Sequence, residues 1–223
     1  MVKARTHCIR CGECCTRSSP TLQRQDLHLI QEGSIAKQHL YSIRKGELVW
    51  DNVIEALVVT REEMIKIREK EDRSCFYYDQ ADKTCRIHEK RPAQCSAMAC
   101  WDPERFMMVY KEPKLTRHDV IKNPALAGLV RAHESKCGYE AMEEHVKRIE
   151  MEGERAVEAI IRMLRFDHRL RPHLSQELDL DLKEMDFIFG RPMTDTIVMF
   201  GLKVEERTGG IFYLTTLPKR AEG

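Results

Sequence analysis

The sequence predicts an α+β protein, mostly helical, with a cysteine-rich metal-binding N-terminal region and a helical C-terminal part that ends in a β-hairpin. Eight of the nine cysteines fall in two groups before residue 101, and none follows Cys137. From Pro124 onward, apolar residues recur at helical spacing among Glu and Arg. Near the end, two apolar-patterned segments flank Gly209-Gly210, which is typical of a hairpin turn.

Glycines and capping residues set the expected boundaries in the N-terminal half. Residues 1–20 look like a loop that ends at Pro20. Gly33 and Gly46 are suited to end helices, and Thr60–Glu63 has the pattern of a capping box. We therefore expect helices at 21–33, 35–45 and 64–68, with an extended segment at 48–59.

The second cysteine group lies in and after a predicted hairpin. Aromatic and β-branched residues at 75–79 and 84–88 surround a polar turn, which favours two short strands. Arg91-Pro92 then starts a turn or short helix that carries Cys95. Asp102-Pro103 predicts a helix over 103–111, and Thr116 can cap another.

The C-terminal part is expected to be helical, with a pause at Cys137-Gly138. The apolar stripe over 139–170 predicts one long amphipathic helix, and Asp181–Phe189 a further helix ended by Gly190. The predicted terminal hairpin pairs 201–206 with 211–216. Because cysteines stop at Cys137, we expect two domains, a metal-binding one at 1–137 and a helical extension at 138–223.

Composition excludes several classes of function. Lys plus Arg number 37 against 36 Asp plus Glu, and this net charge of +1 argues against a dedicated nucleic-acid binder. The longest apolar run is five residues, Phe106–Tyr110, so no membrane-spanning helix is expected. The first residues lack the apolar stretch of a secretion signal, which predicts a cytoplasmic protein. Thiols in a reducing cytosol are more often metal ligands than disulfides.

The first cysteine group has the pattern C-x2-C-x2-C-C, formed by Cys8, Cys11, Cys14 and Cys15. This spacing turns thiolates inward on a tight loop, as zinc sites and iron–sulfur clusters both require. Cys14 and Cys15 pose a separate question, because adjacent side chains of an extended loop point to opposite sides. Either they serve two metals, or one is a ligand and the other packs or reacts.

The second group consists of Cys75, Cys85, Cys95 and Cys100. On one helix Cys95 and Cys100 would point about 140° apart, so they can share a centre only if the helix breaks between them. Four plus four thiolates can form two sites, or one cluster with extra thiols. Three further residues stay open as ligands, namely Cys137, His7 and His88.

These residues together resemble a known family. Cys8, Cys11, Gly12, Cys14 and Cys15, followed by the downstream cysteines with Ile87 and Arg91-Pro92, are similar to the YkgJ-type cysteine-cluster proteins. That family is also called CxxCxxCC, a zinc- or iron-chelating domain. The resemblance spans about residues 5–101 and implies metal binding by the eight cysteines: Cys8, Cys11, Cys14, Cys15, Cys75, Cys85, Cys95 and Cys100.

The sequence thus predicts a metal-binding cysteine-cluster protein with a redox or accessory role. An iron–sulfur centre such as 4Fe-4S is favoured over zinc, because three ligands come from one loop and thiols are in surplus. The alternatives are a redox or protein-modifying enzyme with its metal beside a C-terminal pocket, and a structural zinc module. We expect a protein partner, no nucleic acid and no membrane, and a homo-oligomer could form through residues 139–170.

Overall fold

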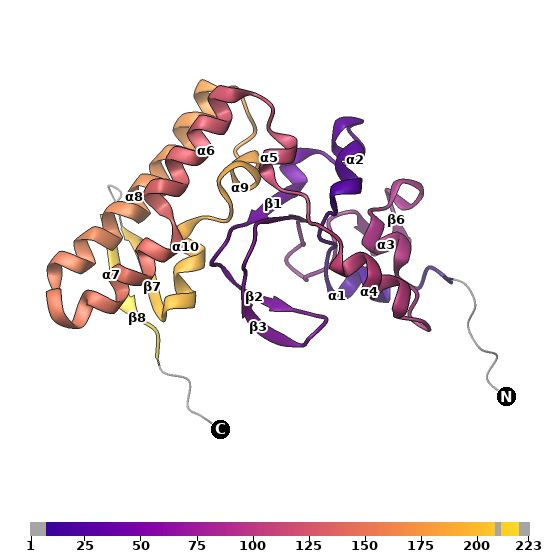
Figure 1. Cartoon of the computed structure of the whole chain (residues 1–223), viewed down its shortest axis with the longest axis horizontal. Helices are drawn as coiled ribbons and strands as arrows, with labels where there is room; N and C mark the ends of the chain where they lie inside the picture. The colour runs from indigo at the N-terminus through magenta and orange to yellow at the C-terminus, as the bar shows by residue number, and fades with distance from the viewer. Residues whose placement is uncertain (1–7, 208–210, 219–223) are drawn as a thin grey trace. The chain divides into compact units, whose positions relative to one another are not determined.

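The computed structural model describes residues 8–207 and 211–218, and its chain forms two compact units (Figure 1). Unit 1 consists of Met1–Ser42 and Met64–Lys122, and unit 2 of Ile43–Glu63 and Asn123–Gly223. The fold class is α+β, as predicted, with roughly half of the described residues in helices. The predicted domains 1–137 and 138–223 divide the chain elsewhere, and whether either folds alone stays a prediction.

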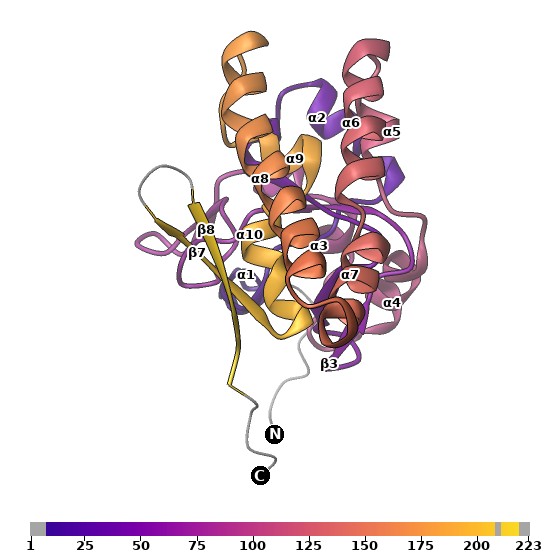
Figure 2. The same ribbon diagram turned by 90° about the vertical axis from the view of Figure 1, so that its left-hand side faces the viewer.

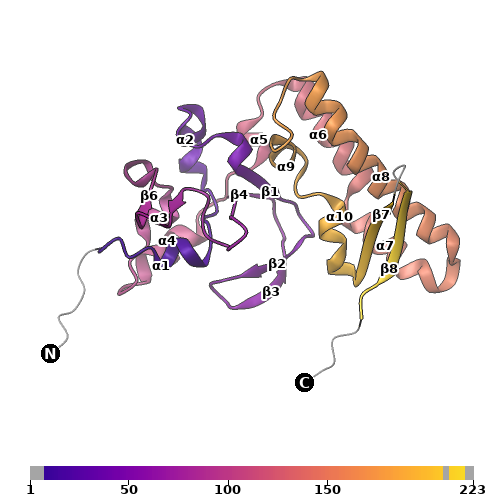
Figure 3. The same cartoon turned by 180° about the vertical axis from the view of Figure 1, so that it is seen from behind.

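Unit 1 combines short helices with two-stranded sheets. In chain order its elements are α1 (Glu13–Arg17), α2 (Leu27–Gln31), β1 (Leu40–Ile43), β4 (Met64–Ile67), β5 (Tyr78–Asp79), β6 (Thr84–Cys85), α3 (Ala93–Ala97), α4 (Glu104–Lys111) and α5 (Arg117–Val120). Short 3-10 turns lie at Arg24–Asp26, Lys37–His39 and His88–Lys90. β1 pairs with β4 (Figure 3), and β5 pairs with β6 in antiparallel register.

Backbone hydrogen bonds join three distant segments at the core of unit 1. The Leu22 amide donates to the Ile65 carbonyl (2.9 Å), and the Ile65 amide donates to that of Leu115 (3.1 Å). The Leu115 amide in turn donates to the Leu22 carbonyl (2.9 Å). All three side chains are fully buried, so this small apolar core fixes the frame that carries the cysteines.

The predictions of helices at 35–45 and 64–68 are wrong. The segment 35–45 contains only the turn Lys37–His39 before strand β1, and residues 64–67 form β4. Burial along β4 alternates residue by residue, which is the period of a strand rather than a helix. Thr60 caps no helix, because its hydroxyl donates to the Arg44 carbonyl (2.7 Å) and accepts from the Glu47 amide (3.1 Å). The predicted helix 21–33 is shortened to α2, which follows a 3-10 turn.

The loop predicted over residues 1–20 contains helix α1, because Gly12 in the left-handed region begins a helical turn there. The predictions for the hairpin, α3, α4 and α5 agree with the structure, with shorter hairpin strands than expected. Strands β5 and β6 form the predicted hairpin, and α3 carries Cys95. Helix α4 follows Asp102-Pro103 as expected. Thr116 caps α5 in a capping box with Asp119, whose carboxylate accepts from the Thr116 amide (2.9 Å) and hydroxyl (2.7 Å).

Unit 2 is built on helices with a hairpin at each end of its sequence. Its elements are β2 (Leu48–Asp51), β3 (Ala56–Val59), α6 (Pro124–Cys137), α7 (Tyr139–Glu152), α8 (Glu154–Glu177), α9 (Glu184–Phe189), α10 (Met193–Thr196), β7 (Leu202–Arg207) and β8 (Ile211–Thr216), with a 3-10 turn at Ile197–Phe200. The segment predicted as extended over 48–59 is a hairpin, with β2 and β3 joined by a turn at 52–55. β7 and β8 confirm the terminal hairpin (Figure 2). The expected turn residues 208–210 lie outside the described part of the chain.

The long helix predicted over 139–170 is two helices. Gly153 adopts a positive φ of 53° between α7 and α8, and the chain turns back there (Figure 1). The apolar stripes of the two helices then pack together with α10 and the terminal hairpin. The core cluster contains Cys137, Met142, Ile160, Met163, Leu164, Met193, Ile197, Leu202 and Phe212. One straight helix would leave half of that stripe without a partner.

A buried arginine attaches the segment 43–63 to the helices of unit 2. The Arg44 guanidinium lies 4.1 Å from the centre of the Tyr139 ring, and its Nη1 donates to the Cys137 carbonyl (3.0 Å). Only 1% of Arg44 is exposed. This stacking on an aromatic face and the hydrogen bond offset part of the cost of burying the charge.

A second buried charge network joins α6, α8 and α10. His133 Nε2 donates to Asp167 Oδ1 (2.7 Å), and Arg171 donates to the same oxygen from Nη2 (2.8 Å). The Met193 amide donates to Asp167 Oδ2 (2.9 Å). Burial alone would raise the pKa of Asp167, but these donors hold it below its usual range. Burial lowers the pKa of His133, so this imidazole is neutral at pH 7.

We expect Asp167→Ala to destabilise the protein by about 3–5 kcal/mol, because it leaves the Arg171 charge buried without its partner. The matched control is Glu158→Ala on the same helix, whose exposed pair with Arg162 contributes about 0.5 kcal/mol or less.

Stability of the unaltered protein should fall as pH drops below 6.5, because the unfolded chain then binds a proton that buried His133 does not. Urea unfolding across pH measures both effects, and equal losses in the two variants would contradict the assignment.

No helix in the described ranges is both long enough and apolar enough to cross a membrane.

Candidate metal centre

The end of the first cysteine motif lies on a short helix. Gly12 has a left-handed φ of 81° and begins α1, where its carbonyl accepts from the amides of Cys15 (2.8 Å) and Thr16 (3.0 Å). Cys14 and Cys15 are therefore helical rather than extended, and their sulfurs lie 3.9 Å apart. The expectation that the two thiols point to opposite sides is wrong, because neighbours on a helix diverge by only about 100°.

The distance between the sulfurs of Cys14 and Cys15 can be compared with that between two ligands of one metal ion. Two thiolates on one tetrahedral zinc, with Zn–S bonds of about 2.3 Å, lie ~3.8 Å apart. The observed 3.9 Å between Cys14 and Cys15 is close to that value. The pair can thus serve a single metal atom, in contrast to the expectation that the two thiols serve two metals or that only one of them is a ligand.

The second cysteine group approaches α1 through the backbone. The Cys75 amide donates to the Cys15 carbonyl (2.7 Å), and this bond ties the start of the 75–85 hairpin to α1. Cys85 lies opposite Tyr78 in the β5–β6 register. Tyr78 is buried, and its ring packs so closely on Gly12 that any side chain at Gly12 would overlap the phenol. Sequence reasoning missed this contact, although Gly12 and Tyr78 were both visible in the motifs.

Cys95 is held by α3, which is anchored to the frame of unit 1. The Ala93 amide donates to Asp26 Oδ1 (2.8 Å), and Gln94 Oε1 accepts from the Thr21 amide (3.0 Å). The helix ends at Ala97, and Met98 is extended, so the break required between Cys95 and Cys100 is present. Cys100 itself is exposed.

Five thiols are close enough to influence one another: those of Cys14, Cys15, Cys75, Cys85 and Cys95. Burial raises the pKa of Cys95, and the nearby thiolates of Cys75, Cys14 and Cys85 raise it further. Burial followed by the charge of Cys85 does the same to Cys75. Like charges gathered in this way need protons or a thiophilic cation to neutralise them. The donor set therefore fits a thiolate-bound metal.

The ligand sphere is not closed in this structure. Within the part of the chain that the structure describes, no three His, Cys, Asp or Glu side chains are arranged around a point as ligands of one ion. Cys8, Cys11 and Cys100 are exposed. Burial raises the pKa of Tyr78, and the nearby thiols of Cys15 and Cys11 raise it further. The structure gathers part of the predicted set and does not confirm the metal-binding region by geometry.

Arg91 is a basic neighbour of the thiols, held in place by His88. Its Nη1 donates to His88 Nε2 (3.0 Å), and His88 Nδ1 donates to Glu89 (3.0 Å). Both imidazole nitrogens are thus engaged, which counts against His88 as a ligand. The pKa of Cys14 falls to about 6, chiefly because the Cys15 thiol donates a hydrogen bond to its sulfur, with a smaller contribution from Arg91.

Of the other two open residues, Cys137 lies in the described part of the chain. Cys137 belongs to the apolar core of unit 2, is fully buried, and has its pKa raised to about 12 by burial. It is an ordinary buried thiol there. His7 lies outside the described residues.

The gathered thiols and the basic Arg91 are consistent with a metal-binding cysteine cluster, and the family comparison supports that class. Residues 7–120, half of the chain, match the family model described as "CxxCxxCC: Putative zinc- or iron-chelating domain". The chain belongs to this family. Membership supports metal binding and leaves zinc and iron both open. Comparison with curated proteins and with solved structures found no match.

We expect Gly12→Ala to reduce the metal content of the purified protein at least about threefold, because the new Cβ overlaps Tyr78 and disfavours the left-handed φ, together on the order of 1–2 kcal/mol. Gly33→Ala is the matched control, since Gly33 has a φ of +73° and nothing within 4 Å of the added Cβ. Metal per chain is measured by elemental analysis. Normal metal content in Gly12→Ala, or an equal loss in Gly33→Ala, would show that the Gly12–Tyr78 contact does not shape the site.

Proposed function

We propose that unit 1 binds an iron–sulfur cluster and that the protein acts as a cytoplasmic redox or accessory protein for a protein partner. The observation that carries this proposal is the approach of three cysteine-bearing segments. The sulfurs of Cys14 and Cys15 on α1 lie 3.9 Å apart, the Cys75 amide donates to the Cys15 carbonyl, and α3 brings Cys95 near the same group. A single zinc site uses four ligands from a compact sphere. An iron–sulfur cluster is larger than one ion and accepts thiolates from more widely separated segments.

The proposed ligands are drawn from the eight cysteines of the family motif. Cys14, Cys15, Cys75, Cys85 and Cys95 are already near one another. Cys8, Cys11 and Cys100 are exposed on chain neighbouring that group and would complete a sphere when metal is bound. When present, the cluster supplies electron transfer. The chain supplies the thiolates, the positive charge of Arg91 beside Cys14, and the buried Tyr78 that limits access of water on the Gly12 side.

A structural zinc site is the second candidate. The 3.9 Å between the sulfurs of Cys14 and Cys15 favours it, because two thiolates at this distance suit one tetrahedral ion. In this case the metal would hold α1 onto the hairpin and α3 and would carry no electrons. The two candidates share their ligands and differ in inorganic sulfide and colour.

Anaerobic purification followed by iron, zinc and sulfide analysis tests the proposal. We expect a brown protein with absorption near about 400 nm that bleaches on reduction. Cys95→Ser should lose most of this absorption, because Cys95 is a thiol of the gathered group. Cys137→Ser is the control and should keep it, since Cys137 lies in the apolar core of unit 2.

Other outcomes decide between the candidates. A colourless protein with stoichiometric zinc and no sulfide would overturn the iron–sulfur proposal and support the zinc site. A protein that binds neither metal, or loses metal equally in Cys95→Ser and Cys137→Ser, would overturn both.

A further inference from the structure

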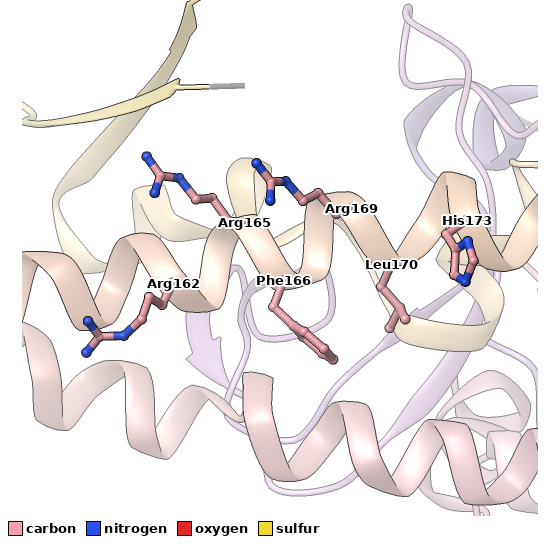
Figure 4. Close-up of a pocket in the computed structure, with 6 residues that line it drawn as sticks. All are labelled: Arg162, Arg165, Phe166, Arg169, Leu170 and His173. Atoms are coloured by element: carbon pink, nitrogen blue, oxygen red, sulfur yellow. The ribbon is translucent and has the colours of Figure 1, made fainter. Parts of the chain in front are cut away.

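We propose that helix α8 carries a docking groove for an acidic, partly apolar segment of a partner protein. The groove has a volume of about 560 Å³ and is formed by Arg162, Arg165, Phe166, Arg169, Leu170 and His173. Figure 4 shows the six side chains projecting from α8, with Arg165 and Arg169 to one side and Phe166 and Leu170 to the other. This surface lies in unit 2, and the proposal does not depend on the metal centre.

The spacing of these residues places them on one face of the helix. Their positions follow the series i, i+3, i+4, i+7, i+8 and i+11, which forms a stripe along an α-helix about 16 Å long. The buried residues of α8, such as Ile160, Leu164 and Arg171, occupy the opposite face. Arg162, Arg169 and His173 are exposed on the outer side of α8, whereas Phe166 lies at its edge and also packs against the core cluster of unit 2.

The positive charge of the groove is largely unneutralised within the described residues. Arg165 Nε is buried and has no hydrogen-bond partner there. Among the described residues, Arg169 forms no ion pair. Arg162 forms only an exposed ion pair with Glu158 (3.6 Å). The nearby acid on α8, Asp167, is buried on the core face and already accepts from His133 and Arg171.

The groove also has an apolar side. Phe166 is half-buried against the core cluster, and Lys136 Nζ of α6 lies 4.6 Å from the centre of its ring. Leu170 extends this surface by one turn. A ligand that matches the groove needs both carboxylates for the arginines and apolar side chains for Phe166 and Leu170.

Charge and shape favour a protein segment over other occupants. A second copy placed symmetrically would bring Arg165 and Arg169 against their own counterparts, and like charges in contact disfavour that arrangement. A net charge of +1 gives the chain no general attraction for nucleic acid. A small molecule would require a more enclosed site, whereas a shallow stripe about 16 Å long suits an extended or helical segment.

The test uses the full chain and a labelled peptide of about eleven residues built from Glu and Leu, long enough to follow the stripe as a helix. We expect saturable binding by fluorescence anisotropy, with amide NMR shifts concentrated at 162–173. The double variant Arg165→Glu/Arg169→Glu should weaken binding at least about tenfold, because two favourable charge contacts become repulsive. Arg131→Glu is the matched control, an exposed arginine on α6 of the same unit, and should change binding less than about twofold.

Three additional reagents keep the result interpretable. The milder Arg165→Gln/Arg169→Gln variant covers the event that charge reversal unfolds the protein, and it should still weaken binding. A peptide with Gln in place of Glu should bind weakly, as should one with Ser in place of Leu.

Four results would overturn the proposal. They are no saturable binding of the Glu–Leu peptide, equal weakening by Arg131→Glu, tighter binding of an oligonucleotide of equal charge at 162–173, and concentration-dependent dimerisation that the double variant abolishes.

Discussion

The hydrogen bond from the Cys75 amide to the Cys15 carbonyl is the contact on which the cysteine cluster depends. It joins α1 to the start of the 75–85 hairpin, two segments that are far apart in the sequence. The closely packed pair of Gly12 and Tyr78 supports the same junction. Once these segments meet, the thiols of Cys14, Cys15, Cys75 and Cys85 fall within electrostatic reach of one another, and α3 adds Cys95.

Bringing these thiols close together disfavours their ionised forms, and this determines how the cluster binds a metal. The thiols of Cys75 and Cys95 hold their protons, because burial and the neighbouring thiolates raise their pKa, whereas the hydrogen bond from Cys15 lowers the pKa of Cys14. A bound metal cation reverses this effect and makes deprotonation favourable, so metal binding and closure of the ligand sphere should occur together. Unit 1 has a small apolar core, and the exposed thiols of Cys8 and Cys11 lie at its least buried edge.

Unit 2 is stabilised differently. Its helices bury a contiguous apolar cluster, and Asp167 compensates the charge of Arg171 within it. Cys137 lies in this core of unit 2, where burial keeps its thiol protonated. The outer side of α8 carries Arg162, Arg165 and Arg169, the residues on which the proposed docking surface rests.

The sequence could predict the features that depend on local chemistry. The 75–88 hairpin, the cap at Thr116, the start of α6 at Pro124 and the terminal hairpin all follow from turn and capping residues. The metal-binding family was evident from the spacing of the cysteines and is confirmed.

The errors arose where tertiary contacts overrode local preference. Residues 64–67 became a strand because the Ile65 backbone pairs with Leu22 and Leu115, which are distant in sequence. The apolar pattern over residues 139–170 does not reveal that the chain turns back at Gly153 and forms two helices. The direction of Cys14 and Cys15 was misjudged because α1 is only five residues long and has no periodic pattern.

The central claim is that thiols from α1, the 75–85 hairpin and α3 hold one metal centre. X-ray absorption at the iron and zinc edges of the anaerobically purified protein tests it most directly. The account predicts a first shell made of sulfur, with bonds of about 2.3 Å, that loses sulfur in Cys95→Ser and is unchanged in Cys137→Ser. A shell of nitrogen and oxygen alone, or a sulfur shell unaffected by Cys95→Ser, would contradict it.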